Sequence, residues 1–243
     1  SILTSWVTDN RDVENVVYDD SLLRSCGIDR DKFPEIVKCT EVIGNLDKEV
    51  VEVLGLTHDV AVVAGAIDNT AAAIGSGAVE DHQAHLYIGT SSWLAAHVPY
   101  KKTDLASSIA SIPCAIPGRY LLHAMQTTAG GNLTFLRDRI LHHEDGVQRE
   151  DGPSDFFDML ERSAKGVPAG SNGVIYAPWV FGERAPVDDR TVRATIYNLS
   201  LEHSRADILR AFLEGVAFNT RWLLRPFEKS TRRRLDGINI IGG

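Results

Sequence analysis

The feature that most constrains the fold of this chain is a change of pattern within residues 60–77, VAVVAGAIDNTAAAIGSG. An apolar run that ends at Gly65 predicts a strand, and the small residues from Thr70 to Ile74 predict a helix. Asp68 lies between them, at a strand-to-helix junction. In an α/β fold this junction lies at the carboxyl edge of the sheet, where ligands usually bind. Asp68 is therefore the first candidate for a functional residue.

An aspartate at the start of a helix has two interpretations, which the residue type alone leaves open. As an N-cap, it accepts a hydrogen bond from an amide in the first helical turn, and this is the commoner role. As a general base, a carboxylate at a sheet edge can take the proton of an alcohol that attacks phosphorus. In the second case Asn69 can orient the same alcohol.

The rest of the chain continues an α/β pattern. Short apolar runs between turn residues predict strands over 60–65, 84–88, 93–98, 120–125, 174–177 and 240–241. Apolar residues at helical spacing predict helices over 20–26, 45–53, 132–141 and 204–224.

These elements are expected to form one sheet covered by helices. The last predicted helix is the clearest, because Ser204 and Asp207 form a capping-box pattern and Pro226 is expected to end it. The expected sheet contains Val62, Ile88, Leu122, Ile175 and Ile240.

Three glycine-containing stretches are candidates for binding phosphate. Gly89-Thr90-Ser91-Ser92 joins two predicted strands and is either an ordinary hairpin turn or a cradle in which backbone amides and hydroxyls surround an anion. It lacks the G-x-x-x-x-G-K-[ST] pattern of a Walker loop. Gly130-Gly131-Asn132 opens a helix, a position that suits a phosphate or a ribose. Gly242-Gly243 follows a strand and is the weakest of the three.

Two charged stretches have a structural and a functional interpretation. The loop 182–189, GERAPVDD, is either a salt-bridged corner or part of a site, and its composition favours the corner. Residues 229–234, KSTRRR, are either a solvated basic patch or a phosphate-binding patch, and the solvated patch is the commoner outcome.

Composition excludes several classes of protein. A net charge of -8 and a pI near 5.5 argue against a general binder of nucleic acid or anionic membrane, which needs a basic face. Cys26, Cys39 and Cys114 are scattered and form no C-x-x-C pair, so we expect a reducing, cytoplasmic setting. No apolar run approaches the ~20 residues of a membrane span. The sequence begins without Met and stops just after a predicted strand, so we expect a truncated chain.

In combination, five stretches resemble the FGGY family of carbohydrate kinases, and within it the xylulokinase-like branch. AGAIDNTAAAIGSGAV resembles the segment with the catalytic aspartate, YIGTSSW the phosphate loop, and TTAGGNLTFLRD a segment that helps to hold the nucleotide. The long stretch from GERAPVDD to EGVAFNTR resembles the second family signature, and INIIGG the start of the adenosine motif. They occur in the family's order, and the resemblance extends over essentially the whole chain.

The resemblance implies an α/β fold of the actin-like, ribonuclease H-like type, with a mixed sheet flanked by helices. It also implies transfer of the γ-phosphate of ATP, with Mg²⁺ carried by ATP, to a hydroxyl of a sugar or polyol, a pentulose such as xylulose being favoured. The roles it assigns are the base for Asp68, a sugar contact for Asn69, and nucleotide or phosphate contacts for Gly89, Thr90, Ser91, Gly130, Gly131, Asn132, Gly242 and Gly243.

The same resemblance sets expectations for domains and partners. Residues 1–59 are expected to be a lead-in segment, and residues 60–243 the C-terminal nucleotide-binding domain, incomplete at its end. An N-terminal sugar-binding domain is expected to be absent, so the chain alone should be a poor kinase. Expected partners are the sugar or polyol, the missing domain and, as an open possibility, a second copy in a homodimer, with no nucleic acid and no membrane.

Two departures from the family pattern leave alternatives open. The loop reads GTSSW where many members have GTSG, and AIDN replaces the commoner GGDN. The first change keeps the hydroxyls and the backbone, so we expect it to be tolerated. A non-catalytic sugar- or nucleotide-sensing module, or a structural fragment without a ligand, remains an alternative to the kinase.

Overall fold

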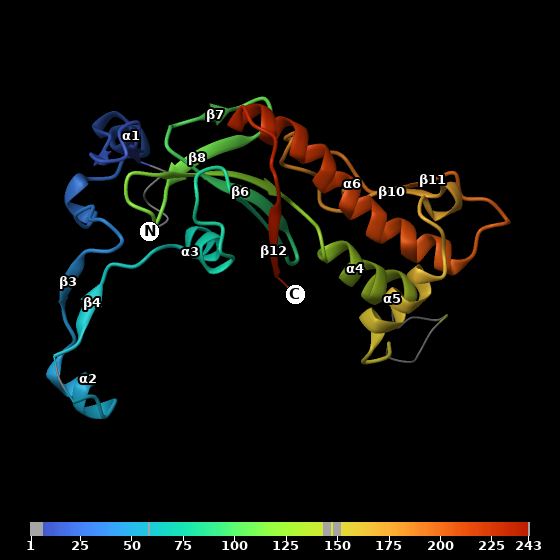
Figure 1. Ribbon diagram of the computed structural model, residues 1–243, viewed down its shortest axis with the longest axis horizontal. Helices are drawn as coiled ribbons and strands as arrows, with labels where there is room; N and C mark the ends of the chain where they lie inside the picture. Colours follow the sequence, from blue (N-terminus) through green and yellow to red (C-terminus); the bar gives the residue numbers. More distant parts are fainter. Residues whose placement is uncertain (1–6, 58, 143–146, 148–151, 243) are drawn as a thin grey trace. The chain divides into compact units, whose positions relative to one another are not determined.

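The α/β pattern is present in the computed structural model, which describes residues 7–57, 59–142, 147 and 152–242 (Figure 1). Contacts divide the chain into two compact units. Unit 1 consists of Ser1–Ala84, Ala95–Lys102 and Ser111–Leu122, and unit 2 consists of His85–Leu94, Thr103–Ala110 and His123–Gly243.

A six-stranded sheet has the order β12-β5-β6-β9-β8-β7. Its strands are β5 (Ala84–Ile88), β6 (Ser92–Val98), β7 (Thr103–Asp104), β8 (Ile109–Pro113), β9 (Tyr120–Gln126) and β12 (Ile238–Gly242). In β6, consecutive residues Leu94 and Ala95 are both fully buried. Because neighbouring side chains in a strand point to opposite faces, the centre of this sheet is covered on both sides.

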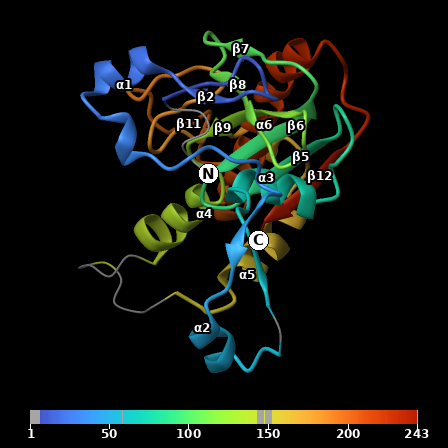
Figure 2. The same ribbon diagram turned by 90° about the vertical axis from the view of Figure 1, so that its left-hand side faces the viewer.

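Two of the strands predicted for this sheet lie outside it. β4 (Ala61–Val63) pairs antiparallel with β3 (Val42–Asn45), as Figure 2 shows, and β10 (Ile175–Ala177) pairs antiparallel with β11 (Thr195–Tyr197). The placement of Val62 and Ile175 in the main sheet was therefore wrong. A short apolar run does not reveal its partner or its burial, and Ile175 is 53% exposed.

Unit 1 opens with short elements held by local hydrogen bonds. β1 (Thr8–Asp9) pairs with β2 (Val17–Tyr18), and a 3₁₀ turn covers Arg30–Lys32. Helix α1 (Asp20–Cys26) matches its prediction: Asp19 Oδ1 accepts hydrogen bonds from two amides of the first turn, and Gly27 ends the helix in the left-handed conformation.

The second predicted helix of unit 1 is shorter than expected. α2 (Lys48–Val53) is capped by Asp47, because Asn45 is the last residue of β3. The third helix, α3 (Asp68–Gly75), follows β4 after four residues without regular structure. This is the strand-to-helix junction predicted from residues 60–77.

In unit 2 a core forms where α6 (Arg205–Thr231) packs on β10 and α5 (Phe156–Lys165) (Figure 1). The rings of Tyr176 and Phe212 stack at 3.6 Å. Gly215 permits this close approach, because a Cβ atom there would collide with the carbonyl oxygen of Tyr176. The unit also contains α4 (Gly131–Phe135), which continues as the π-helical η3 (Leu136–Leu141), and the 3₁₀ turn Ser171–Gly173.

Helix α6 starts as predicted but does not end at Pro226. Asp207 accepts hydrogen bonds from the Ser204 amide (2.6 Å) and hydroxyl (2.7 Å), as in a capping box. Pro226 lies inside the helix, which continues to Thr231. The proline removes one amide donor, but Leu223 and Phe227 on either side of it are fully buried, and this packing holds the helix together.

Candidate functional site

Asp68 is the first residue of α3, in unit 1. The N-cap position belongs to Ile67, so the interpretation of Asp68 as an N-cap is wrong. Its Oδ1 accepts a hydrogen bond from the Asn69 amide at 2.7 Å, and none of the described residues donates to Oδ2. The side chain is exposed. One carboxylate oxygen is thus held in place while the other is available to a ligand.

Asn69 presents a polar atom that lacks a partner. Its Oδ1 atom is buried, and no described residue bonds to it. Because an unpaired buried polar atom is costly, such an atom marks a place where a ligand or water is expected to complete the hydrogen bonding. Asp68 and Asn69 together therefore form a small polar site at the start of α3.

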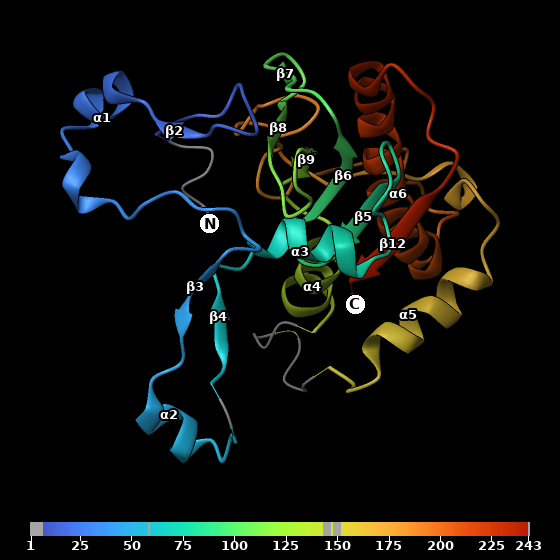
Figure 3. The same cartoon turned by 60° about the vertical axis from the view of Figure 1, so that its left-hand side comes forward.

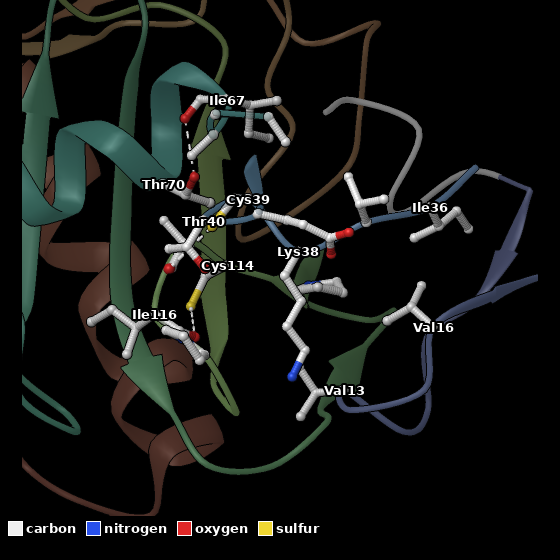
Figure 4. A pocket seen from close by; sticks show the side chains of 18 of the residues that line it. Val13, Val16, Ile36, Lys38, Cys39, Thr40, Ile67, Thr70, Cys114 and Ile116 are labelled. Carbon is white, nitrogen blue, oxygen red and sulfur yellow. Dashed lines mark hydrogen bonds between the residues drawn. The ribbon is translucent and has the colours of Figure 1, made fainter. Parts of the chain in front are cut away.

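A cavity of about 460 Å³ lies beside this junction, within unit 1 (Figure 4). Ile67 and Thr70, which flank the Asp68-Asn69 pair, are part of its lining. Cys39 and Cys114 also line it, and both are free thiols. Burial raises the pKa of the Cys114 thiol to about 11, so this group is not a thiolate nucleophile at neutral pH.

In unit 2 the turn Gly89–Ser91 joins β5 to β6 and is locked onto the segment before α4. Gly89 O accepts a hydrogen bond from Gly130 N at 2.8 Å. Thr90 O accepts from Ala129 N at 2.8 Å and from Gly131 N at 3.1 Å. Two of the predicted phosphate stretches are therefore in direct contact.

This interlock sets the direction of the loop amides. In a planar trans peptide, the carbonyl of one residue and the N–H of the next point in opposite directions. Because the carbonyls of Gly89 and Thr90 point to the 129–131 segment, the N–H groups of Thr90 and Ser91 point away from it. Thr90 is exposed. The turn is thus a hairpin connection, and its use as a cradle for an anion stays a prediction.

The glycines of this region are required by close backbone contacts. A Cβ atom at Gly130 would lie 2.7 Å from Gly89 O, and one at Gly131 would lie 3.0 Å from Thr90 O. Gly242 in β12, which runs beside β5 (Figure 3), could not carry a side chain either, because it would collide with Ile88 O. Gly243 lies outside the described residues. Binding of a phosphate-bearing ligand such as a nucleotide at this turn stays a prediction.

Asn132 is placed differently from the expectation of a nucleotide contact. It is fully buried, its Nδ2 donates to Ala129 O at 3.1 Å, and its Oδ1 accepts from the Tyr176 hydroxyl at 2.8 Å. Its side chain thus links the segment before α4 to Tyr176 in the buried core. A direct contact between Asn132 and a nucleotide stays a prediction.

The loop 182–189 contains a polar residue that the sequence did not single out. Glu183 is only 2% exposed and accepts hydrogen bonds from the amides of Thr127 and Arg184 and from the side chain of Asn219. None of the ion pairs among the described residues involves this loop, so the salt-bridged corner was the wrong interpretation. In the 229–234 stretch, the four cationic residues are exposed, consistent with a solvated patch.

Comparison with family models decides the relationship of the chain. Residues 7–75 match the N-terminal domain of the FGGY family of carbohydrate kinases, and residues 84–243 match the C-terminal domain. The chain belongs to the FGGY family of carbohydrate kinases. The first match ends at residue 75 and the second begins at residue 84, so Asp68 falls in the N-terminal match. We predicted a domain boundary at 59/60, and this boundary stays a prediction.

Relatives of this FGGY chain include sugar kinases of more than one specificity. It is 29% identical to a xylulose kinase of Staphylococcus epidermidis over 214 residues, which is 88% of this chain and 40% of the relative. It is 27% identical to a gluconokinase of Bacillus subtilis over 227 residues, 93% of this chain and 44% of the relative. The chain thus spans less than half the length of these relatives.

Solved structures of the family have the same fold. A ligand-bound xylulose kinase from Lactobacillus acidophilus matches with a TM-score of 0.79 and 28% identity, over 96% of this chain and 45% of that one. The predicted actin-like α/β fold is therefore confirmed. No helix in the described part of the FGGY chain is long and apolar enough to cross a membrane.

Proposed function

We propose that this chain is part of an ATP-dependent kinase that phosphorylates a hydroxyl of a sugar or polyol, with a pentulose such as xylulose favoured. The observation that carries the proposal is Asp68, an exposed carboxylate held through one oxygen at the start of α3. Family membership and relatives named xylulose kinase support it. A relative named gluconokinase makes the choice of sugar a matter for experiment.

In this proposal the residues have separate tasks. Asp68 takes the proton of the sugar hydroxyl as its oxygen attacks the γ-phosphorus. Asn69 orients that hydroxyl through its side-chain amide. The amides of Thr90 and Ser91 bind phosphate oxygens, and Gly130 and Gly131 keep the loop in place. Bound ATP and Mg²⁺ supply the transferable phosphoryl group and the neutralisation of its charge, while the bond from phosphorus to ADP breaks.

Domain organisation and partners belong to the same proposal. The chain carries the base and the phosphate loop, and further sugar contacts come from another part of the same protein. We propose that the chain alone binds nucleotide but turns over slowly, and that it acts in the cytoplasm.

The decisive experiment for function is an ADP-release assay with a panel of acceptors. The full-length protein is given Mg-ATP with xylulose, gluconate, glycerol or other sugars and polyols in turn. We expect ADP release that depends on the acceptor, with the highest kcat/KM for xylulose. Nucleotide binding without acceptor-dependent release for any compound would instead identify a non-catalytic sensing module.

A further inference from the structure

Glu183 is a buried carboxylate that forms no ion pair with any of the residues the structure describes. Its Oε1 accepts hydrogen bonds from the amides of Thr127 and Arg184, both at 2.8 Å, and its Oε2 accepts from Asn219 Nδ2 at 2.5 Å. Burying a charge is costly unless hydrogen bonds replace the lost water. Here three N–H groups do so, and charge-assisted bonds of this kind are stronger than neutral ones.

The three donors come from different parts of unit 2. Thr127 directly follows β9, Arg184 belongs to the same loop as Glu183, and Asn219 lies in the middle of α6. Asn219 is itself fixed, because its Oδ1 accepts from Trp179 Nε1 at 3.2 Å and its backbone oxygen accepts from Gln126 Nε2 at 2.8 Å. Glu183 thereby ties the end of β9 to a long, buried helix.

The end of β9 leads directly into the interlock with the phosphate loop. Ala129, two residues after Thr127, donates its amide to Thr90 O, and Gly130 donates to Gly89 O. Thr128, which lies between Thr127 and Ala129, is held through its hydroxyl, which donates to Pro178 O at 2.9 Å. The position of Thr127 therefore determines where the 129–131 amides meet the loop.

We propose that Glu183 is a positioning residue for the phosphate loop. It acts through the 127–131 segment and does not itself touch the ligand. The proposal rests on the proposed function, since the ligand of the loop is taken to be the phosphate chain of a nucleotide.

Variants can separate the hydrogen-bond pattern from mere burial. Glu183→Gln keeps an oxygen for the two amides but places an N–H group against Asn219 Nδ2, so one donor loses its acceptor. Combining it with Asn219→Asp restores the contact with reversed polarity, because the new carboxylate accepts from the glutamine and from Trp179. The double variant is the rescue.

The matched control is Glu214→Gln, also in unit 2. Glu214 accepts from the Gly170 amide (3.0 Å), the Ser171 hydroxyl (2.8 Å) and Arg210 (2.8 Å), a similar set of donors. It lies in the same helix as Asn219, but none of its hydrogen bonds to described residues reaches 89–91 or 127–131. Its substitution removes comparable bonding without disturbing the loop.

The first measurement is amide hydrogen exchange of the nucleotide-free chain. The amides to follow are the hydrogen-bonded ones of the two segments, those of Gly89, Thr127, Ala129, Gly130 and Gly131. We expect Glu183→Gln to raise their exchange by about tenfold or more, on the scale of a lost hydrogen bond to a charged group. The double variant should restore protection, and Glu214→Gln should leave these amides protected. Unchanged exchange in Glu183→Gln, or the same increase in Glu214→Gln, would overturn the proposal.

The second measurement is the Kd for Mg-ADP of the same variants by calorimetry. This Kd should rise in Glu183→Gln by about the same factor as the exchange rate, and it should return to the wild-type value in the double variant. If Glu183→Gln loosens the loop but the wild-type chain binds no nucleotide, the positioning role stands and the proposed function fails. If the wild-type chain binds nucleotide and Glu183→Gln binds it equally well, the positioning role fails and the proposed function stands.

Discussion

Three of the aspartates near helix starts, Asp19, Asp68 and Asp207, use their carboxylates in different ways. Asp19 caps α1 through two amides, and Asp207 bonds back to Ser204 within the capping box of α6. Asp68 uses only one oxygen, for the Asn69 amide. The carboxylates of Asp19 and Asp207 are engaged in hydrogen bonds at the starts of their helices. Of the three, Asp68 is therefore the one with an oxygen available to act as a base.

The Asp207 carboxylate should make stability depend on acid. The Ser204 hydroxyl and amide, together with Asn172, lower the pKa of Asp207 to about 2. A pKa that is lower in the folded than in the unfolded state contributes stability above the unfolded value, about 4, which is lost as the pH falls towards 2. We expect Asp207→Asn to be less stable than wild type at pH 5, with the difference shrinking towards pH 2.5.

Urea unfolding at a series of pH values measures this effect. Asp104→Asn is a suitable control, because Asp104 contributes to a short loop contact and not to a helix start. A difference between wild type and Asp207→Asn that stays constant from pH 5 to pH 2.5 would contradict the assignment.

At the scale of elements, the site is built from two chain segments whose backbones touch. The turn Gly89–Ser91 and the entry to α4 share three backbone hydrogen bonds, and small residues make this contact possible. The interlock turns the loop carbonyls inward and the loop amides outward. A phosphate site without a lysine depends on such backbone order, because no mobile charge can compensate for a displaced amide.

Gly130→Ala tests this contact. The added Cβ would lie 2.7 Å from Gly89 O, so one of the two segments must move. We expect the affinity for Mg-ADP to fall about tenfold, equivalent to ~1.4 kcal/mol. Gly166→Ala is the control, because its Cβ would make an ordinary contact at 3.6 Å with Ser163 O. Equal affinity in the two variants would show that the interlock does not control binding.

The sequence predicted elements better than it predicted their partners. Local signals placed α1 and the start of α6 correctly, because caps and helical spacing act over a few residues. Pro226 was misleading because its local cost is outweighed by burial around it, which depends on distant residues. Glu183 could not be recognised, since its three donors come together only in the folded chain. Its place in the GERAPVDD stretch, which resembles a family signature, was the signal that the sequence offered.

At the scale of the whole molecule, the residues with proposed roles are divided between the two units. Unit 1 contains Asp68 and Asn69, and unit 2 contains the phosphate loop and its support. The order of five motifs was sufficient to predict the family, because order along the chain is preserved where pairwise identity falls to 24–29%. The sugar could not be predicted, since relatives of similar identity are named for xylulose and for gluconate.

The role of Asp68 as the base is tested by the rate of ADP release with xylulose and Mg-ATP in the full-length protein carrying Asp68→Asn. Loss of a general base predicts a fall in kcat of ~10²-fold or more with little change in the KM for ATP. Asp81→Asn is the matched control, because Asp81 is also an exposed aspartate of unit 1 but pairs with Arg119. A wild-type rate in Asp68→Asn would show that Asp68 is not the base.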